Sequence, residues 1–510
     1  MNYSNNNKRI AVNTLFLYIR MLFTMAISLY TSRVILKVLG ADDFGIYNVV
    51  GGVVVLFSFL TNAMTSSTQR FLNYNLGLND RTKISNVFNT AIQTHLTILF
   101  IVLFCSETIG LWFVQTHLNI PSERMLAANW VYQMSIIATL INIIVIPFRA
   151  SIIAAERMSI FAIASIIEVS LKLISVSVLV YISQDKLIAY SISIVCVSLI
   201  TFFIYKVQCN KKLTFTKLRF HWDKRQYTEM LSFSGWYFLG GMANVASNQG
   251  INIIINIFFS VGVNAAVGIA NQVKTAVLTF TSSFQTAFNP QIVKMYAVKD
   301  INRLIVLLFR SSKFSYFLLI IILFPIIFFC DEILALWLYD VPQYAVIFTQ
   351  LVVISAILDV LSSPLMTAVG ATGKVKNYQI GVSMIIMADL PLTYIAFKGG
   401  LSPTYAFIIK LIVSIFVYIF RLYYVRKYIK FDITDYLRKV IQPCIMVSLL
   451  SLPIPLFLQE MSTSIMSTIS LIVLNEIIVC LLIIFVGLDN DERVFFKQSS
   501  IKITKKLLRK

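Results

Sequence analysis

The sequence predicts an all-α integral membrane protein with about fourteen transmembrane helices, and three observations carry this prediction. Hydrophobic residues make up 58% of the 510 residues and charged residues only 13%, about half the charged share of soluble domains, which is roughly 25%. Apolar runs long enough to cross a bilayer recur along the chain. Lysine and arginine gather in alternate loops, as they do on the cytoplasmic side of membrane proteins.

The expected spans follow the apolar runs in order. Six lie in the first part of the chain, at residues 10–36, 44–64, 84–106, 126–148, 160–182 and 187–206. Eight more follow a basic loop, at residues 231–259, 264–288, 304–330, 344–369, 376–397, 402–425, 440–458 and 464–487. The first run is too long for the apolar core of a cleavable signal peptide, so we expect it to remain as the first span.

Loop charges set the expected orientation. With the N-terminus in the cytoplasm, every cytoplasmic loop is basic, and the largest basic group runs from Lys206 to Arg225. The opposite loops hold acids such as Glu123 and Asp185 and only a few bases. Both termini are therefore expected in the cytoplasm. The net charge of +20 follows from this bias, with attraction to anionic membrane lipids, and needs no nucleic-acid partner.

Cysteine and histidine usage argues against a disulfide framework or a metal centre. The six cysteines lie in apolar runs or beside basic clusters without CxxC spacing, so we expect free thiols. The three histidines are scattered along the chain, so we expect no metal site.

An internal repeat relates the first twelve spans. Asn79-Asp80 is followed 220 residues later by Lys299-Asp300. A second set is matched 217 residues later, with Pro147, Ala154, Arg157 and Phe161 answered by Pro364, Ala371, Lys374 and Tyr378. Each half has six spans and begins in the cytoplasm, so the halves are expected to be parallel repeats around a central cleft. The expected domains are a six-helix lobe (1–206), a basic cytoplasmic linker (207–230), a second six-helix lobe (231–430), and two extra helices with a basic tail (431–510).

Two basic residues lie about midway along expected spans, Arg20 in the first and Lys274 in the eighth. A charge at this depth costs several kcal/mol unless it faces water or a partner, and such residues mark transport pathways. The cargo is therefore expected to be anionic. The planar fork of Arg20 suits phosphate oxygens. Structural pairing with a buried acid is the alternative interpretation of both residues.

Amides and further charges extend the candidate lumen. Four asparagines at i, i+4 spacing form one stripe on the seventh span, and one more lies on the eighth: Asn244, Asn248, Asn252, Asn256 and Asn271. They are expected to line a water-filled lumen as substrate-binding residues, or else to bond between helices.

Asp359, Asp389 and Lys410 lie in spans ten to twelve and are candidates for coupling to Na⁺ or H⁺, with an Asp–Lys pair as the alternative. Pro391 would free backbone carbonyls near Asp389. Glu168 and Lys172, four residues apart, are expected to neutralise each other.

Several stretches give the chain a family resemblance. They are residues 33–38, the sequence Leu39-Gly-Ala-Asp-Asp-Phe-Gly-Ile-Tyr47, Arg70-Phe71, and residues 147–157. Over about residues 10–430 the chain resembles the polysaccharide (O-antigen, Wzx-type) flippases of the multidrug/oligosaccharidyl-lipid/polysaccharide exporter superfamily, which is MATE-like.

The resemblance implies a protein of the bacterial inner membrane that moves an undecaprenyl-diphosphate-linked oligosaccharide from the cytoplasmic to the periplasmic leaflet by alternating access, for O-antigen, lipopolysaccharide or capsule synthesis. It also implies a polysaccharide polymerase and a chain-length regulator as partners, and no cofactor apart from a coupling ion.

Two other functions are alternatives to the flippase. A cation-coupled multidrug or metabolite exporter of the same superfamily is the second hypothesis, although the first span lacks the acid that proton-coupled exporters usually place there. A membrane polysaccharide polymerase is the third. Its chemistry generally needs a long periplasmic loop, and the longest external loops, near 107–125 and 331–343, are short and hold no paired carboxylate and base. We therefore expect no catalytic residues and no enzymatic activity.

Overall fold

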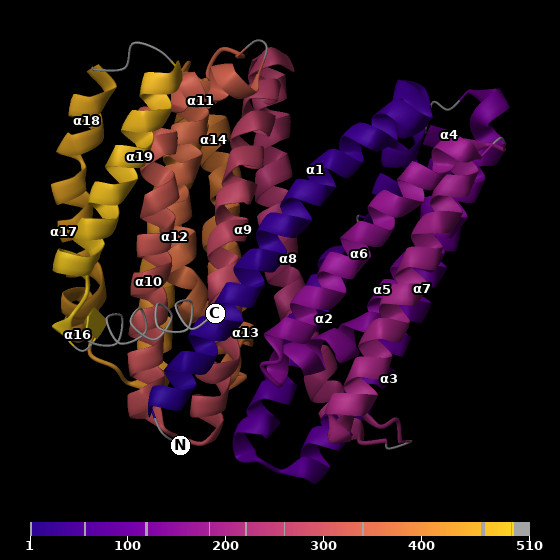
Figure 1. Ribbon diagram of the computed structural model, residues 1–510, viewed down its shortest axis with the longest axis horizontal. Coiled ribbons are helices and arrows are strands. Elements are labelled where there is room, and N and C mark those ends of the chain that lie inside the picture. Colours follow the sequence, from indigo (N-terminus) through magenta and orange to yellow (C-terminus); the bar gives the residue numbers. More distant parts are fainter. Residues whose placement is uncertain are drawn as a thin grey trace, which may run out of the picture. The chain divides into compact units, whose positions relative to one another are not determined.

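The computed structural model describes residues 3–55, 58–117, 121–182, 184–219, 222–259, 261–338, 341–460, 465–490 and 492–493. The secondary-structure elements in these ranges are all helices (Figure 1), which confirms the all-α prediction. The chain divides into two compact units, an N-terminal unit of Ala11–Gly241 and a C-terminal unit of Met242–Lys510 together with Met1–Ile10. The boundaries of the four domains expected from the sequence stay a prediction.

Eight helices contribute to the N-terminal unit. They are α1 (Tyr3–Val55), α2 (Ser58–Leu78), α3 (Arg81–Cys105), α4 (Leu111–His117), α5 (Met125–Ala154), α6 (Met158–Val178), α7 (Lys186–Lys212) and the first half of α8 (Lys224–Phe258). Short 3₁₀ or π segments lie at Ser106–Gly110, Ser122–Arg124, Leu179–Tyr181 and Thr214–Thr216.

The C-terminal unit contains the second half of α8 and the remaining helices. These are α9 (Val261–Ala297), α10 (Ile301–Phe328), α11 (Cys330–Trp337), α12 (Ala345–Thr372), α13 (Lys376–Met387), α14 (Asp389–Lys398), α15 (Thr404–Ile429), α16 (Ile433–Tyr436), α17 (Gln442–Ser451), α18 (Pro453–Glu460) and α19 (Ile465–Leu482). Two π segments lie at Leu437–Ile441 and Ile483–Gly487.

The chain is a multi-pass membrane protein. Ten helical segments of the described chain are long and apolar enough to cross a membrane. The four other expected spans fall on α1, α2, α8 and α9, which have 53, 21, 35 and 37 residues and are therefore long enough. Within α1, the described residues Val12–Ser28 form a shorter apolar stretch. A count of about fourteen spans is consistent with the structure.

The first two expected spans differ from the structure in where the helix ends. The sequence suggests an interruption at residues 37–43, but α1 continues through them to Val55. No proline lies in α1, and a single glycine such as Gly40 weakens a helix without ending it. Elsewhere the expected spans correspond to helices, except that the eleventh is divided at Ala388 into α13 and α14 and the thirteenth at Leu452 into α17 and α18. Pro391 has no amide hydrogen, so it cannot donate the backbone hydrogen bond to the carbonyl four residues before it. The division between α13 and α14 lies next to this missing bond.

The internal repeat is visible in the backbone of each unit. Asn79 and its counterpart Lys299 both have positive φ, 57° and 59°. The aspartate after each caps the next helix, because Asp80 accepts from the amide of Lys83 and Asp300 accepts from that of Arg303. The same left-handed turn and cap therefore recur 220 residues apart.

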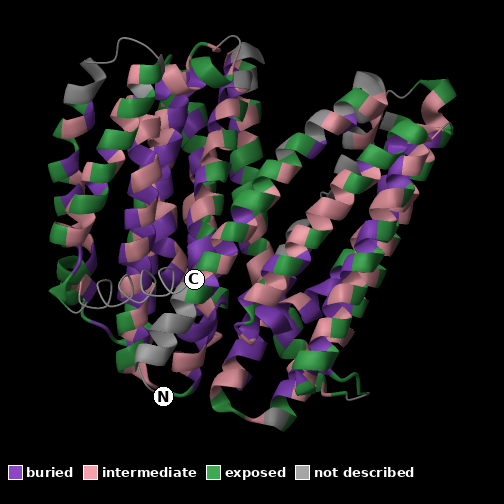
Figure 2. Ribbon diagram, in the orientation of Figure 1, coloured by how far each residue is buried: buried purple, intermediate pink, exposed green. Residues whose placement is uncertain are grey.

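Packing follows the repeat as well. In each unit the fourth span packs on the second and the sixth, namely α5 on α2 and α7, and α12 on α9 and α15. A short helix precedes the fourth span in both units, α4 before α5 and α11 before α12. Figure 2 shows buried positions along α5 and α12, whereas the described positions of α19 are mainly exposed or half-buried, as expected of a helix that faces lipid.

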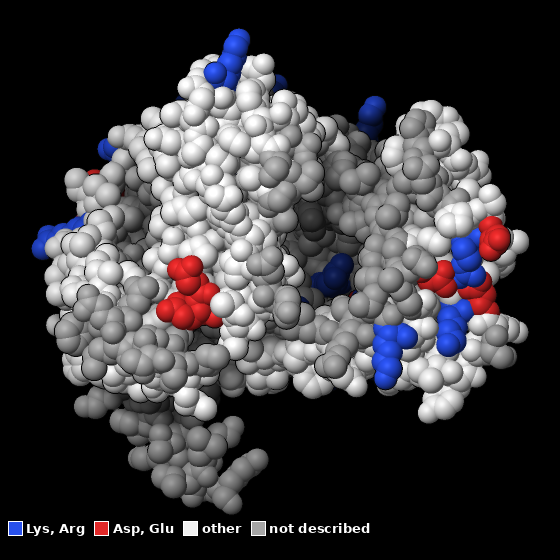
Figure 3. All heavy atoms as spheres, turned by 90° about the horizontal axis from the view of Figure 1, so that it is seen from above, with Lys and Arg blue, Asp and Glu red and all other residues white. Residues whose placement is uncertain are grey.

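Ion pairs connect three segments at one end of the N-terminal unit. Arg124 contacts Asp43 of α1 and also lies 2.6 Å from Asp185, which caps α7. Partial burial alone would raise the pKa of Asp185, but hydrogen bonds from Arg124 and from two amides of α7 lower it below its usual value. The three residues therefore lie at one end of the unit, as the loop pattern predicted. The face drawn in Figure 3 is mostly uncharged, with blue and red side chains in small groups.

Candidate binding site in the C-terminal unit

The asparagine stripe lies on α8. Asn244 and Asn248 have exposed side chains, and Asn252 is half-buried. The amide of Asn248 donates to the carbonyl of Asn244 (2.8 Å), and that of Asn252 donates to Gln249 (3.3 Å). The side chain of Asn256 lies outside the described residues. The stripe thus bonds largely within its own helix and leaves oxygen atoms for neighbouring helices or ligands.

Lys274 of α9 is paired with an acid. Its Nζ lies 2.8 Å from Asp359 of α12 and donates to the hydroxyl of Ser355 at 3.2 Å. The side chain of Lys274 is 18% exposed and that of Asp359 is 42% exposed. Asn271, one turn earlier on α9, is half-buried and accepts a bond at its backbone carbonyl from Thr275. The charge of Lys274 is therefore balanced by a partner that is still open to water or a ligand.

Asp389 and Lys410 point to different partners. Oδ2 of Asp389 accepts a hydrogen bond from Ser247 at 2.9 Å, while its Oδ1 is buried without a hydrogen-bond partner in the described structure. Lys410 of α15 donates to the side-chain oxygen of Asn248. Among the described residues, the two form no ion pair with each other, so the simple Asp–Lys pair considered from the sequence is not present.

These side chains share one cavity. It has a volume of about 90 Å³, and its lining includes Asn244, Asn248, Lys274, Asp359, Asp389 and Lys410. This size admits several water molecules. The cavity thus unites six of the residues that the sequence put forward, contributed by α8, α9, α12, α14 and α15.

Arg421 of α15 also lines this cavity, and the sequence analysis missed it. Its side chain is 8% exposed, and its Nε has no hydrogen-bond partner in the described structure. Arg421 lies near the end of its span, close to Arg426 and Lys427, where it resembles an ordinary cytoplasmic base. Its spacing of eleven residues from Lys410 was the available signal, because eleven residues make just over three helical turns. With Arg421 the cavity holds three bases and two acids.

Arg20 lies in the N-terminal unit. Its guanidinium lies over the ring of Phe161 at 4.8 Å, and its buried Nε has no hydrogen-bond partner among the described residues. Arg149 of α5 is close enough to repel it electrostatically, and Tyr205 of α7 is close as well. No acid among the described residues forms an ion pair with Arg20, so the structural pairing considered from the sequence is not seen there.

Other embedded charges are paired locally. Lys172 and Glu168 form the expected i, i+4 bridge at 2.7 Å. A buried cluster on α10 was not predicted from the sequence: Lys313 lies 2.6 Å from Glu492, and Arg310 lies 3.6 Å from the same carboxylate. All six cysteines are free thiols, as predicted.

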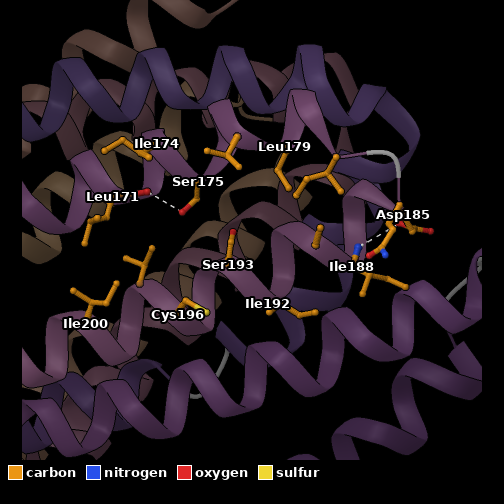
Figure 4. A pocket seen from close by; sticks show the side chains of 15 residues that line it. Leu171, Ile174, Ser175, Leu179, Asp185, Ile188, Ile192, Ser193, Cys196 and Ile200 are labelled. Carbon is orange, nitrogen blue, oxygen red and sulfur yellow. Dashed lines mark hydrogen bonds between the residues drawn. The ribbon is translucent and has the colours of Figure 1, made fainter.

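A larger groove of about 570 Å³ lies between α6 and α7 (Figure 4). Its lining is mainly aliphatic, with Leu171, Ile174, Ile192 and Ile200 along it and Asp185 at one end. Its bases and amides are too few to bind an anionic group. The charged cavity of the C-terminal unit is therefore the better candidate site.

Comparison with known proteins places the chain in a family. Its residues 10–296, more than half of the chain, match the family model described as polysaccharide biosynthesis protein. The chain belongs to the polysaccharide biosynthesis protein family. A search of curated proteins finds no match.

Solved structures with a similar fold include transporters described as members of the MOP superfamily. A multidrug resistance MATE family transporter in an outward-facing conformation matches with a TM-score of 0.70 and 12% identity, over 82% of this chain and 95% of that one. A MOP superfamily transporter from Pyrococcus furiosus, described as having a binding pocket of reversed polarity, matches with a TM-score of 0.69 and 11% identity, over the same shares of the two chains. At these identities the matches show the fold alone, which is MATE-like.

Proposed function

We propose that this protein is a flippase of the bacterial inner membrane. It moves an undecaprenyl-diphosphate-linked oligosaccharide from the cytoplasmic to the periplasmic leaflet by alternating access, with both termini in the cytoplasm. Family membership supports a role in polysaccharide biosynthesis, and the fold supports transport. The observation that carries the proposal is the excess of bases in the charged cavity, where Lys274, Lys410 and Arg421 face two acids.

A lipid-linked diphosphate suits this cavity electrostatically. In our proposal a phosphoryl oxygen takes the place of Asp359 as the partner of Lys274, while Ser355 keeps its hydrogen bond to the ammonium group. Displacing a carboxylate that is already part-exposed costs less than separating a fully buried pair. The amides of Asn244 and Asn248 can donate to hydroxyl or phosphoryl oxygens nearby.

Asp389 is the candidate for coupling transport to an ion gradient. Its unpartnered Oδ1 offers an acceptor for a proton or a small cation inside the cavity. The same feature favours the second candidate function, a cation-coupled exporter of a small molecule, for which MATE transporters provide the structural likeness. The two functions differ in cargo, and the cargo is therefore the quantity to measure.

Surface glycan in cells tests the flippase. A strain that depends on this protein for surface polysaccharide is complemented with wild type, with the double variant Arg20→Ala, Lys274→Ala, and with the exposed control Lys224→Ala. We expect the double variant to reach the membrane and lose most of its glycan export, because both embedded bases are gone, while the control exports normally. Normal glycan export by the double variant would refute a cationic pathway, and export of a dye without any effect on glycan would favour the exporter.

A further inference from the structure

One face of α15 carries two basic residues at different depths. Lys410 and Arg421 are eleven residues apart, which places them within about 20° of each other around the helix and about 16 Å apart along it. Val413, Ser414 and Val417 lie between them on the same face, and all five residues line the charged cavity. The cavity therefore extends along α15 with a base toward each end.

The surroundings of the two bases differ. Lys410 donates to Asn248 and lies in the region where Lys274, Asp359 and Asp389 gather. Arg421 is more than nine-tenths buried, and its Nε has no hydrogen-bond partner in the described structure. A buried guanidinium with an unused donor is costly unless a ligand or water completes it. The geometry of a guanidinium, with parallel N–H groups, fits phosphoryl oxygens.

The direction of α15 orders the two positions. Arg426 and Lys427 follow Arg421 in the last turns of the helix and are exposed, as in a cytoplasmic end with its excess of bases. Arg421 is therefore nearer to the expected cytoplasmic end of the cavity, and Lys410 is farther along the path.

We propose that Arg421 is an anion-binding residue that receives a phosphoryl group of the cargo at the cytoplasmic end of the cavity, before that group reaches Lys410 and Lys274. This inference rests on the proposed flippase function for the identity of the cargo, but the anion site itself does not depend on transport. When the phosphoryl group passes from one base to the next along the same helix face, it travels a shorter distance without a positively charged partner. Arg421 therefore has a role separate from that of Lys410 and Lys274.

Binding of inorganic pyrophosphate to the purified full-length protein tests the inference. The probe is radiolabelled pyrophosphate, and its dissociation constant is measured for wild type, Arg421→Gln, Arg421→Lys and the control Arg426→Gln. We expect Arg421→Gln to weaken binding about ten- to hundredfold, the range for losing a charge-assisted contact. Arg421→Lys should bind with intermediate affinity because it keeps the charge and loses the fork. Arg426→Gln, on the exposed side of the same helix, should bind as wild type does.

The outcomes separate this inference from the proposed function. Unchanged pyrophosphate affinity in a monodisperse Arg421→Gln variant, or equal loss in Arg421→Gln and Arg426→Gln, would overturn the anion site even if lipid-linked cargo is flipped. Absence of pyrophosphate binding to wild type would also overturn it. Binding that depends on Arg421 in a protein that flips no lipid-linked sugar would keep the anion site and remove the flippase. If Arg421→Gln does not fold, the comparison of Arg421→Lys with wild type decides, because equal affinity in these two proteins contradicts recognition by the fork.

Discussion

Asp359 is predicted to compete with the cargo for Lys274. The two side chains lie 2.8 Å apart, and Asp359 is 42% exposed, so an incoming anion can displace it. Asp359→Asn keeps the shape of the side chain and raises the charge of the cavity from +1 to +2, counting Lys274, Lys410 and Arg421 against Asp359 and Asp389. Lys274 keeps its hydrogen bond to Ser355, so the variant should fold.

The size of the effect follows from Coulomb's law. With an effective dielectric constant of about 20, a carboxylate about 8 Å from the bound anion repels it by about 2 kcal/mol, and physiological salt reduces this to about 1 kcal/mol. Pyrophosphate should therefore bind Asp359→Asn roughly five- to tenfold more tightly than wild type. Isothermal titration at low and physiological salt measures this, and the difference should shrink as salt rises.

The control is Asp331→Asn, which removes the same charge from an exposed position on α11 outside the cavity. It should leave pyrophosphate affinity unchanged. If Asp359→Asn binds pyrophosphate more weakly than wild type, or if Asp331→Asn gives the same gain, competition between Asp359 and an anion for Lys274 is the wrong account of this pair.

Three further predictions concern other charged residues. Arg20→Lys should retain only part of the glycan export of wild type, because a point charge replaces a bidentate fork; full export in a quantitative surface-glycan assay would argue against bidentate contact. Asp389→Asn should bind cargo but lose the dependence of transport on a sodium or proton gradient in proteoliposomes, and retained dependence would exclude Asp389 from coupling. Lys313→Met leaves Glu492 buried with only Arg310, at 3.6 Å, as its base, and should destabilise the protein by at most about 3–5 kcal/mol. The double variant Lys313→Met, Glu492→Leu should recover most of that loss in chemical unfolding, whereas no recovery would show that the cost arises elsewhere.

Local sequence signals predicted the fold well because they depend on neighbours in the chain. A left-handed residue followed by a capping aspartate, as at Asn79-Asp80 and Lys299-Asp300, is encoded in a few positions, and the structure has this turn in both units. Span lengths follow equally from local hydropathy. The continuation of α1 through residues 37–43 was not predictable in this way, because glycine and aspartate lower helix propensity without forbidding a helix.

The contacts of the site were harder to predict because they join helices far apart in sequence. The stripe of asparagines and the embedded charges were visible as residue types on helix faces, but nothing local shows that Lys274 meets Asp359, or that Asp389 bonds to Ser247 instead of Lys410. Arg421 was missed because it lies near the end of a span, where the sequence does not distinguish a base in a cytoplasmic loop from a base buried in a cavity. Which helices are neighbours decides these contacts, and that information belongs to the packing of the whole unit.

The most direct test of the central claim is transbilayer movement of the lipid itself. The full-length protein is reconstituted in vesicles with an undecaprenyl-diphosphate-linked oligosaccharide, and the fraction of sugar that becomes accessible to a lectin or glycosidase outside is followed in time. We predict movement well above that of protein-free vesicles, strongly reduced in Lys274→Gln and in Arg421→Gln and preserved in Arg426→Gln. Movement no faster than in protein-free vesicles, with wild type transporting a cationic drug under the same gradient, would contradict the flippase and support the exporter.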